Sequence, residues 1–243
     1  MNGPMIYFTI PILGGIPITQ TTVSSFLVMV ILCVTGGILG RHLQKRPSGR
    51  QVLTEKLITT LYDMVGDTMG RHNLYWAPYI GTLFLSSALG SLIGMTGFLR
   101  SATSDLSTTL TWALMTSVLV WVCSIRANGV WGWLKGYAEP VAVMLPMNIV
   151  SEIAQPISMA FRHFGNIMGG VLTSLLYSAL AAASSLIFGW LPGLLGEIPF
   201  LQVGIPAVLS LYFDIFSGFV QALVFSLLTM VYVGNACPPP EIE

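Results

Sequence analysis

The sequence is poor in charged side chains, which make up 8% of its 243 residues, whereas hydrophobic residues make up 54%. An ordinary soluble domain carries roughly 25% charged residues. The ten basic and ten acidic residues cancel, so the net charge gives no reason to expect nucleic acid or another polyanion as a partner. Scarce charge therefore excludes an ordinary soluble domain and indicates a membrane protein.

Cysteine is scarce as well, and Cys33, Cys123 and Cys237 lie far apart without the spacing of metal ligands. Three distant cysteines predict neither a disulfide framework nor a zinc site, so we expect no metal and no cofactor. No GxxxxGK[ST] loop occurs, so no nucleotide site is predicted. The first residues show neither the basic stretch nor the cleavage site of a signal peptide, and we expect this segment to be retained.

Long apolar runs separated by short polar connections predict several membrane helices, because about 20 apolar residues cross the hydrocarbon core. Strand-length alternation of apolar and polar residues, which a transmembrane barrel requires, is missing. The first three spans are expected over residues 24–40, 76–99 and 106–125.

A basic cluster in residues 41–50 follows the first span, which predicts a cytoplasmic loop and an external N-terminus. Residues 53–69 combine apolar positions at helical spacing with charged positions between them. This pattern predicts an amphipathic helix on the cytoplasmic membrane surface.

Two apolar segments near the C-terminus are too long to stand upright in a bilayer. Residues 148–190 would form a helix of about 65 Å and residues 200–234 one of about 50 Å, against about 30 Å of hydrocarbon. No polar loop divides the first segment, although Pro156 and three glycines permit a kink. We therefore expect a hairpin of two long, steeply tilted helices. The predicted fold class is all-α, with about five membrane helices and one amphipathic surface helix.

A single membrane domain is expected over residues 1–243. Its predicted parts are an external N-terminal segment (1–23), the first span with the amphipathic helix and a helical hairpin (24–140), the tilted hairpin (141–235) and a tail (236–243).

Arg162 is a permanent cation in the middle of an apolar segment, where it costs about 3 kcal/mol on insertion scales. Hydrogen-bonding and small residues recur beside it at steps of three or four, and so share one face of the predicted helix. That face comprises Glu152, Gln155, Met159, Arg162, Asn166, Gly169 and Thr173. A second polar face, on the last helix, comprises Asp214, Ser217, Gln221 and Tyr232.

Two polar faces inside a membrane predict a hydrated ion path. The alternative from charge placement alone is a structural pair between Arg162 and Asp214 that fixes helix packing. A sealed pair needs neither the paired glycines nor the trail of amides and hydroxyls beside Arg162, so the pattern favours the ion path.

The stretch "NIVSEIAQPISMAFRHFGNIMGG", together with "GFVQALVFSLLTMVYVGNA", closely resembles subunit a of the F-type ATP synthase. The resemblance extends to the first span, the basic loop, the amphipathic helix and "SDLSTTLTWAL", so it covers most of the chain. It implies that Arg162 is the indispensable arginine of the family, that Asn166 lies in the access path and that Gln221 neighbours Arg162. It also implies that Glu152 and Ser151 belong to a cytoplasmic half-channel.

The resemblance further implies an ion-translocating stator subunit that is not an enzyme on its own. Two half-channels would couple proton or sodium flow to rotation of a ring of subunit c, and so to ATP synthesis. The implied partners are that ring, the peripheral-stalk subunit b, the rest of the synthase and the lipid bilayer. The implied location is a bacterial inner membrane, with the C-terminus in the cytoplasm.

Two positions depart from the family pattern. Val171 stands where the family often has an acid or a histidine, and Asp214 stands where it often has a histidine or another acid. We therefore expect Asp214 to carry alone a polar role that relatives usually divide between two side chains.

Two other classes of function are weighed on the residues alone. A self-contained secondary transporter would bind an anionic substrate at Arg162, but such folds usually show repeated halves and this sequence shows none. An intramembrane hydrolase would need paired catalytic aspartates or an HExxH motif. Asp214 is the single aspartate of the predicted membrane segments, so it has no second aspartate to pair with, and no HExxH motif occurs.

Overall fold

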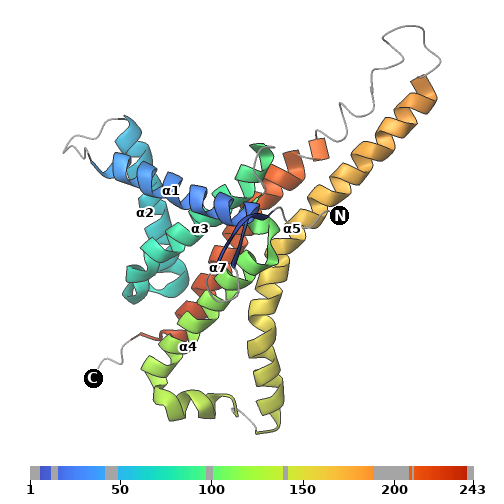
Figure 1. Cartoon of the computed structure of the whole chain (residues 1–243). Coiled ribbons are helices and arrows are strands. Elements are labelled where there is room, and N and C mark those ends of the chain that lie inside the picture. The colour runs from blue at the N-terminus through green and yellow to red at the C-terminus, as the bar shows by residue number, and fades with distance from the viewer. Residues whose placement is uncertain are drawn as a thin grey trace.

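The computed structural model describes residues 6–11, 16–41, 49–96, 101–138, 142–188, 208–209 and 211–239. These residues are predominantly helical, which confirms the all-α class (Figure 1). A short antiparallel pair of strands, β1 (Ile6–Ile10) and β2 (Ile16–Thr19), lies near the N-terminus and was not predicted. The main helices are α1 (Gln20–Gly40), α2 (Gly49–Met69), α3 (Ala77–Leu92), α4 (Leu106–Gly136), α5 (Leu145–Phe188) and α7 (Gly218–Ala236).

Short helical turns connect or extend these helices. The 3-10 segments are η1 (Arg71–Trp76), η2 (Ile93–Thr96), η3 (Ala102–Ser104) and η4 (Ala142–Met144), and a π-helical segment, η6 (Leu211–Ser217), leads into α7.

Three helical segments in the described part of the chain are long and apolar enough to cross a membrane. They are Gln20–Gly40, Leu106–Gly136 and Ile215–Ala236. The first and third predicted spans are therefore confirmed as helices, and α4 is longer than predicted. The second predicted span, 76–99, is shorter as an α-helix, because α3 has 16 residues and continues as the 3-10 turn η2.

Helix α4 continues beyond the predicted span because it changes direction at Gly129, whose φ of 70° lies in the left-handed region that glycine tolerates. The segment after Gly129 turns toward the start of α5 at the bottom of Figure 1. The apolar run and its interfacial extension thus form one element with a sharp bend.

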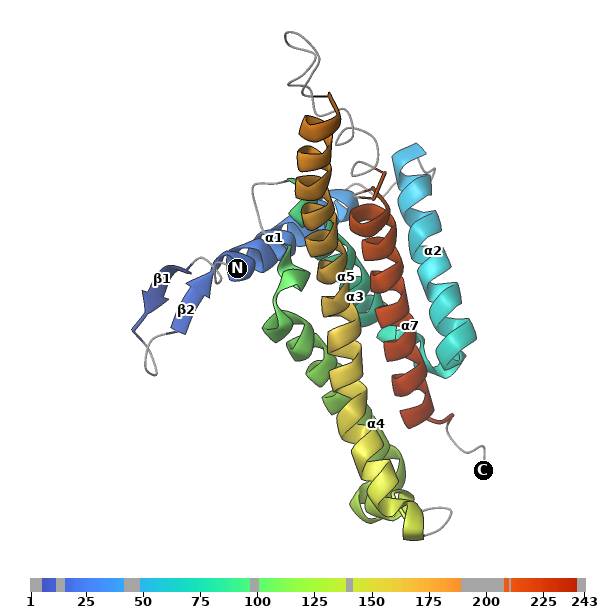
Figure 2. The ribbon, with the colours of Figure 1, turned by 90° about the vertical axis from the view of Figure 1, so that its right-hand side faces the viewer.

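Helix α5 is a single element of 44 residues with Pro156 inside it, as the absence of a polar interruption predicted. It bends in Figure 1 and is nearly straight in the perpendicular view of Figure 2. The predicted helix over residues 200–234 is helical where it is described from Leu211 onward, but its first part is the π-helical segment η6, which was not predicted.

The core is built around α7. One cluster joins residues of α2, α3 and α4 to Met230 and Val233 of α7. A second cluster joins Met159 of α5 to Phe225 of α7 and to residues of α3 and α4. Helix α7 is therefore the element that the other helices cover.

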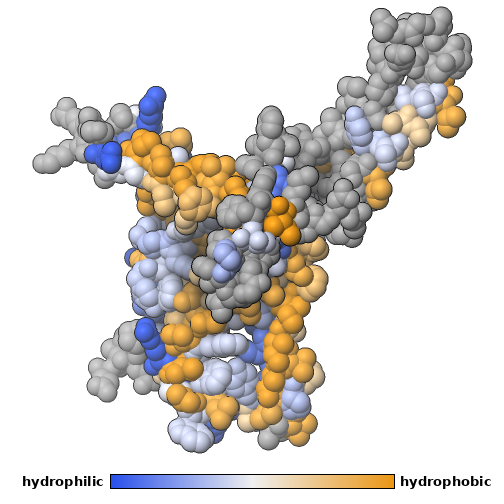
Figure 3. All heavy atoms as spheres, in the orientation of Figure 1, coloured by the Kyte–Doolittle hydropathy of each residue, from blue (hydrophilic) through white to orange (hydrophobic). Residues whose placement is uncertain are grey.

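The outer surface is strongly apolar. Large hydrophobic side chains are exposed along α1, including Phe26 and Ile38, and orange surface covers α1 and the flanks of α4 and α5 in Figure 3. Such an extensive exposed apolar surface fits contact with lipid and not with water. The structure is thus that of a multi-pass membrane protein.

Candidate functional site

Arg162 lies on α5 immediately after the contact between α5 and α7. Met159 and Ala160 are 3% and 0% exposed and pack in one cluster with Phe225 of α7. Arg162, by contrast, is exposed. Met159 and Arg162 belong to the same predicted face of α5. Met159, in the middle of that face, is buried, whereas Arg162 lies at its exposed edge.

Within the described part of the chain, Arg162 forms no hydrogen bond or ion pair with another residue. The backbone of Asp214 lies in the π-helical segment η6 and that of Asn166 lies in α5, one turn after Arg162. The side chains of Asp214 and Asn166 fall outside the described atoms, so the alternative of an Arg162–Asp214 pair stays untested.

Gln221 lies beside the same contact between α5 and α7, but on helix α7. It precedes Phe225 by one turn of α7, and Arg162 follows Met159 by about one turn of α5. Helices α5 and α7 run in opposite directions in both views (Figures 1 and 2). Gln221 and Arg162 are therefore displaced in the same direction from the Met159–Phe225 contact.

The amide nitrogen of Gln221 lacks a hydrogen-bond partner in the described part of the chain. This atom, Nε2, is buried. A buried donor without a partner costs about 1–3 kcal/mol, so such a group normally meets ordered water or a ligand. Tyr232, about three turns further along α7, is half-buried and packs against the second cluster.

Glu152 is held by α4. Its carboxylate accepts a hydrogen bond from Nε1 of Trp121. Burial raises the pKa of Tyr137, which follows the end of α4, and the negative charge of Glu152 raises it further. Glu152 thus connects the beginning of α5 to α4.

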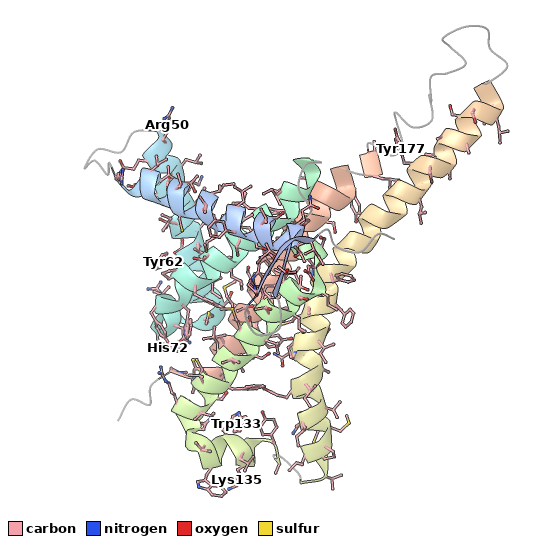
Figure 4. The ribbon with its side chains drawn as sticks, viewed as in Figure 1. Arg50, Tyr62, His72, Trp133, Lys135 and Tyr177 are labelled. Atoms are coloured by element: carbon pink, nitrogen blue, oxygen red, sulfur yellow. The ribbon has the colours of Figure 1, made fainter. Side chains whose placement is uncertain are left out.

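Further contacts strengthen this corner between α4 and α5, and the bend at Gly129 makes them feasible. Asn148 donates to the carbonyl oxygen of Tyr137 at 2.9 Å, and the rings of Trp133 and Tyr137 meet edge to face at 5.2 Å. In Figure 4, Trp133 faces the space between α4 and α5, whereas Lys135 points away from it.

The remaining predicted site residues on α5 differ in exposure. Ser151 is exposed and Gln155 is half-buried. Sequence reasoning missed Trp121 and Tyr137. An isolated aromatic residue in or after an apolar helix gives no signal that it will lie near a distant carboxylate, and Glu152 is 31 positions from Trp121.

Asp105 is a second carboxylate with a clear structural role. It accepts from the backbone nitrogen of Ser107 at 3.0 Å, which caps the start of α4, and from the hydroxyl of Thr21 at 3.1 Å. An aspartate before an apolar run is a typical helix-capping signal. The second bond ties α1 to α4, which the local sequence does not reveal.

Apolar helices long enough to span a membrane, with an exposed cation and an unsatisfied amide beside one interhelical contact, define a multi-pass membrane protein with a polar site between two helices. The particular family follows from comparison with known proteins. The family model described as ATP synthase A chain matches residues 22–234, and the chain belongs to this family, subunit a of the F-type ATP synthase.

Several relatives match over nearly the whole chain. The chain is 32% identical to the sodium ion specific ATP synthase subunit a of Propionigenium modestum, over 99% of this chain and 87% of the relative. It is 30% identical to ATP synthase subunit a of Legionella pneumophila (strain Corby), over 100% and 96%. It is 34% identical to ATP synthase subunit a 1 of Crocosphaera subtropica, over 90% and 87%. The chain is thus a membrane component of the ATP synthase complex, with a part in ion transport and ATP synthesis.

Proposed function

We propose that this chain is the stator subunit that carries ions between two half-channels past a rotating ring of subunit c. The observation that carries the proposal is the exposed Arg162, which has no hydrogen bond or ion pair to another described residue although it follows a buried helix contact. A permanent cation in an apolar helix requires a charged partner or water. An acidic side chain on a neighbouring subunit would provide the negative charge that pairs with Arg162, and it would also explain why a fixed cation is required there.

Electrostatics gives Arg162 its role in this mechanism. A guanidinium near a carboxylate lowers the carboxyl pKa by about 1–3 units, so a ring carboxylate that reaches Arg162 gives up its proton or sodium ion. When the carboxylate moves on, it takes up a new ion from the opposite half-channel. The same cation repels ions that would pass directly between the half-channels, so ion flow is coupled to rotation.

The half-channel residues follow from the family resemblance and the helix faces. Glu152, Ser151 and Gln155 would line the cytoplasmic side, and Asn166, Asp214 and Gln221 the opposite side. Tyr232 extends the polar face of α7. The unsatisfied amide of Gln221 supports this assignment, because a water-filled path would provide its missing partner.

The orientation proposed for the chain places the N-terminus outside and the C-terminus in the cytoplasm of a bacterial inner membrane. Helix α1 crosses α7 at a large angle in both views (Figures 1 and 2). If α1 spans the bilayer upright, α7 lies strongly tilted, which supports the expected slanting hairpin. Helix α2 ends beside the end of α7, consistent with an amphipathic helix at the cytoplasmic surface.

Replacing Arg162 with alanine tests the proposal. Without the guanidinium the ring carboxylate keeps its ion, so we expect ATP-driven ion pumping in inverted membrane vesicles to fall about 10- to 1,000-fold. The matched control is Arg126→Ala, which removes an exposed arginine of α4 outside the site. Pumping by Arg162→Ala at the rate of the control would refute the assigned role.

A further inference from the structure

The end of α7 meets the joint between α2 and η1 at one backbone carbonyl group. Nδ2 of Asn73 donates to the carbonyl oxygen of Cys237 at 3.0 Å and to that of Met69 at 3.0 Å. Asn73 is 2% exposed. Because two carbonyl oxygens face this end of the amide, it is the NH2 group that points at them. Asn73 thus bridges the end of α2 and the end of α7.

His72 meets the same carbonyl group. Its Nε2 atom lies 3.0 Å from the carbonyl oxygen of Cys237 and 2.9 Å from Nδ2 of Asn73. With a proton on Nε2 the ring donates to the carbonyl oxygen of Cys237, and without one it accepts from the amide of Asn73, so His72 joins this bridge in either tautomer. The last carbonyl groups of a helix have no partner within the helix, so Asn73 supplies a donor that α7 lacks at its end.

The packing around this carbonyl is close. A Cβ atom on Gly234 would lie 3.2 Å from the Cα atom of Met69, so the approach of α7 to α2 depends on glycine. Cys237 packs against the buried cluster that contains Met69, Val233 and Cys123 of α4. Cys123 is 7% exposed.

We infer that His72, Asn73 and the carbonyl group of Cys237 form a C-terminal anchor that sets the axial position of α7. Gln221 lies on the same helix about 24 Å from the anchor, so a shift of the helix end moves Gln221 relative to Arg162. His72 and Asn73 are therefore positioning residues and do not touch the ion. The consequence for ion transport rests on the proposed function, whereas the anchor itself rests on contacts within the chain.

The burial of Cys123 reports directly on the anchor. In the assembled synthase in inverted vesicles, Cys33→Ser and Cys237→Ser leave Cys123 as the single thiol of the chain, and its rate of alkylation by N-ethylmaleimide is measured. Asn73→Asp places carboxylate oxygens against both carbonyl groups. We expect alkylation to become about tenfold faster and ATP-driven pumping to fall by a similar factor. Asn235→Asp, at an exposed position of α7, is the matched control and should change neither rate.

A second pair of variants separates positioning from a general loss of structure. His72 is exposed, so its replacement does not disturb the core. His72→Gln keeps an amide that can donate or accept near the position of Nε2, and it should retain the parental alkylation and pumping rates. His72→Leu removes the hydrogen-bonding group and should accelerate alkylation about threefold, as expected for one neutral hydrogen bond. If an immunoblot shows that Asn73→Asp prevents assembly, the comparison of His72→Gln with His72→Leu tests the anchor.

Each outcome has a defined meaning. Parental alkylation rates in both Asn73→Asp and His72→Leu would overturn the anchor. Faster alkylation with unchanged pumping would overturn its positioning role. Arg162→Ala should slow pumping about 10- to 1,000-fold while Cys123 is alkylated at the parental rate. If that variant pumps normally while the anchor variants still expose Cys123, the proposed function fails and the anchor stands.

Discussion

At the scale of single residues, Arg162 and Gln221 belong to the predicted site, and both have a polar group without a partner in the described part of the chain. One is a permanent cation at an exposed position, and the other is an amide whose nitrogen is buried. Both flank the buried cluster that contains Met159 and Phe225. Buried or membrane-embedded polar groups are costly unless water or a partner satisfies them, so these two residues indicate where the chain depends on its surroundings.

Gln221→Leu tests this reasoning at the residue scale. Leucine has a similar volume but no hydrogen-bonding group, so it should dry the path beside Arg162 and slow ion uptake. We expect the initial rate of ATP-driven pumping to fall about tenfold, the effect of a loss of about 1.4 kcal/mol. Gln51→Leu, an amide of α2 outside the site, serves as control. A Gln221→Leu variant as fast as this control would place the ion path elsewhere.

At the scale of elements, the corner between α4 and α5 is stabilised by a carboxylate that belongs to the predicted site. Glu152 accepts a hydrogen bond from Trp121, so it joins α5 to α4. Hydrogen bonds to a charged group contribute about 1.5–3 kcal/mol. The start of the helix that carries Arg162 is thus held in place by this corner.

Trp121→Phe measures the strength of that corner. Phenylalanine keeps an aromatic ring but lacks the Nε1 donor, and one oxygen of Glu152 loses its partner. We expect the free energy of unfolding to fall by about 1.5–3 kcal/mol, seen as a lower midpoint for the loss of native structure in detergent. Trp131→Phe, at a position 83% exposed, should leave the midpoint unchanged. Equal midpoints for the two variants would mean that the hydrogen bond does not stabilise the corner.

At the scale of the whole molecule, α7 contributes one face to both buried clusters, whereas α1 exposes long apolar side chains such as Phe26 and Ile38. The molecule therefore has a packed interior along one face of α7 and an apolar exterior. Under the proposed function, the exposed Arg162 is the point at which this arrangement meets a subunit with an acid.

Purification in mild detergent examines that requirement. A stator subunit should elute with a ring-forming hairpin protein and a soluble ATPase, because its exposed cation is satisfied in the complex. A self-contained transporter should elute alone with comparable stability. Arg162→Ala should still co-elute, since packing around α7 does not involve this side chain. Elution of the parental chain as a stable monomer, with no ATPase activity in its fraction, would contradict the proposed function.

The sequence by itself determined the membrane class, the main helices, the unbroken α5 and the family, because composition, run length and a distinctive arginine motif are local properties. Only the tertiary structure decided which residues meet. Asn73 reaches Cys237 over 164 positions, Trp121 reaches Glu152, and Met159 is buried while Arg162 is exposed. Such contacts depend on helix directions, on the bend at Gly129 and on close packing at Gly234, and the spacing of residues within one helix contains no information about these features.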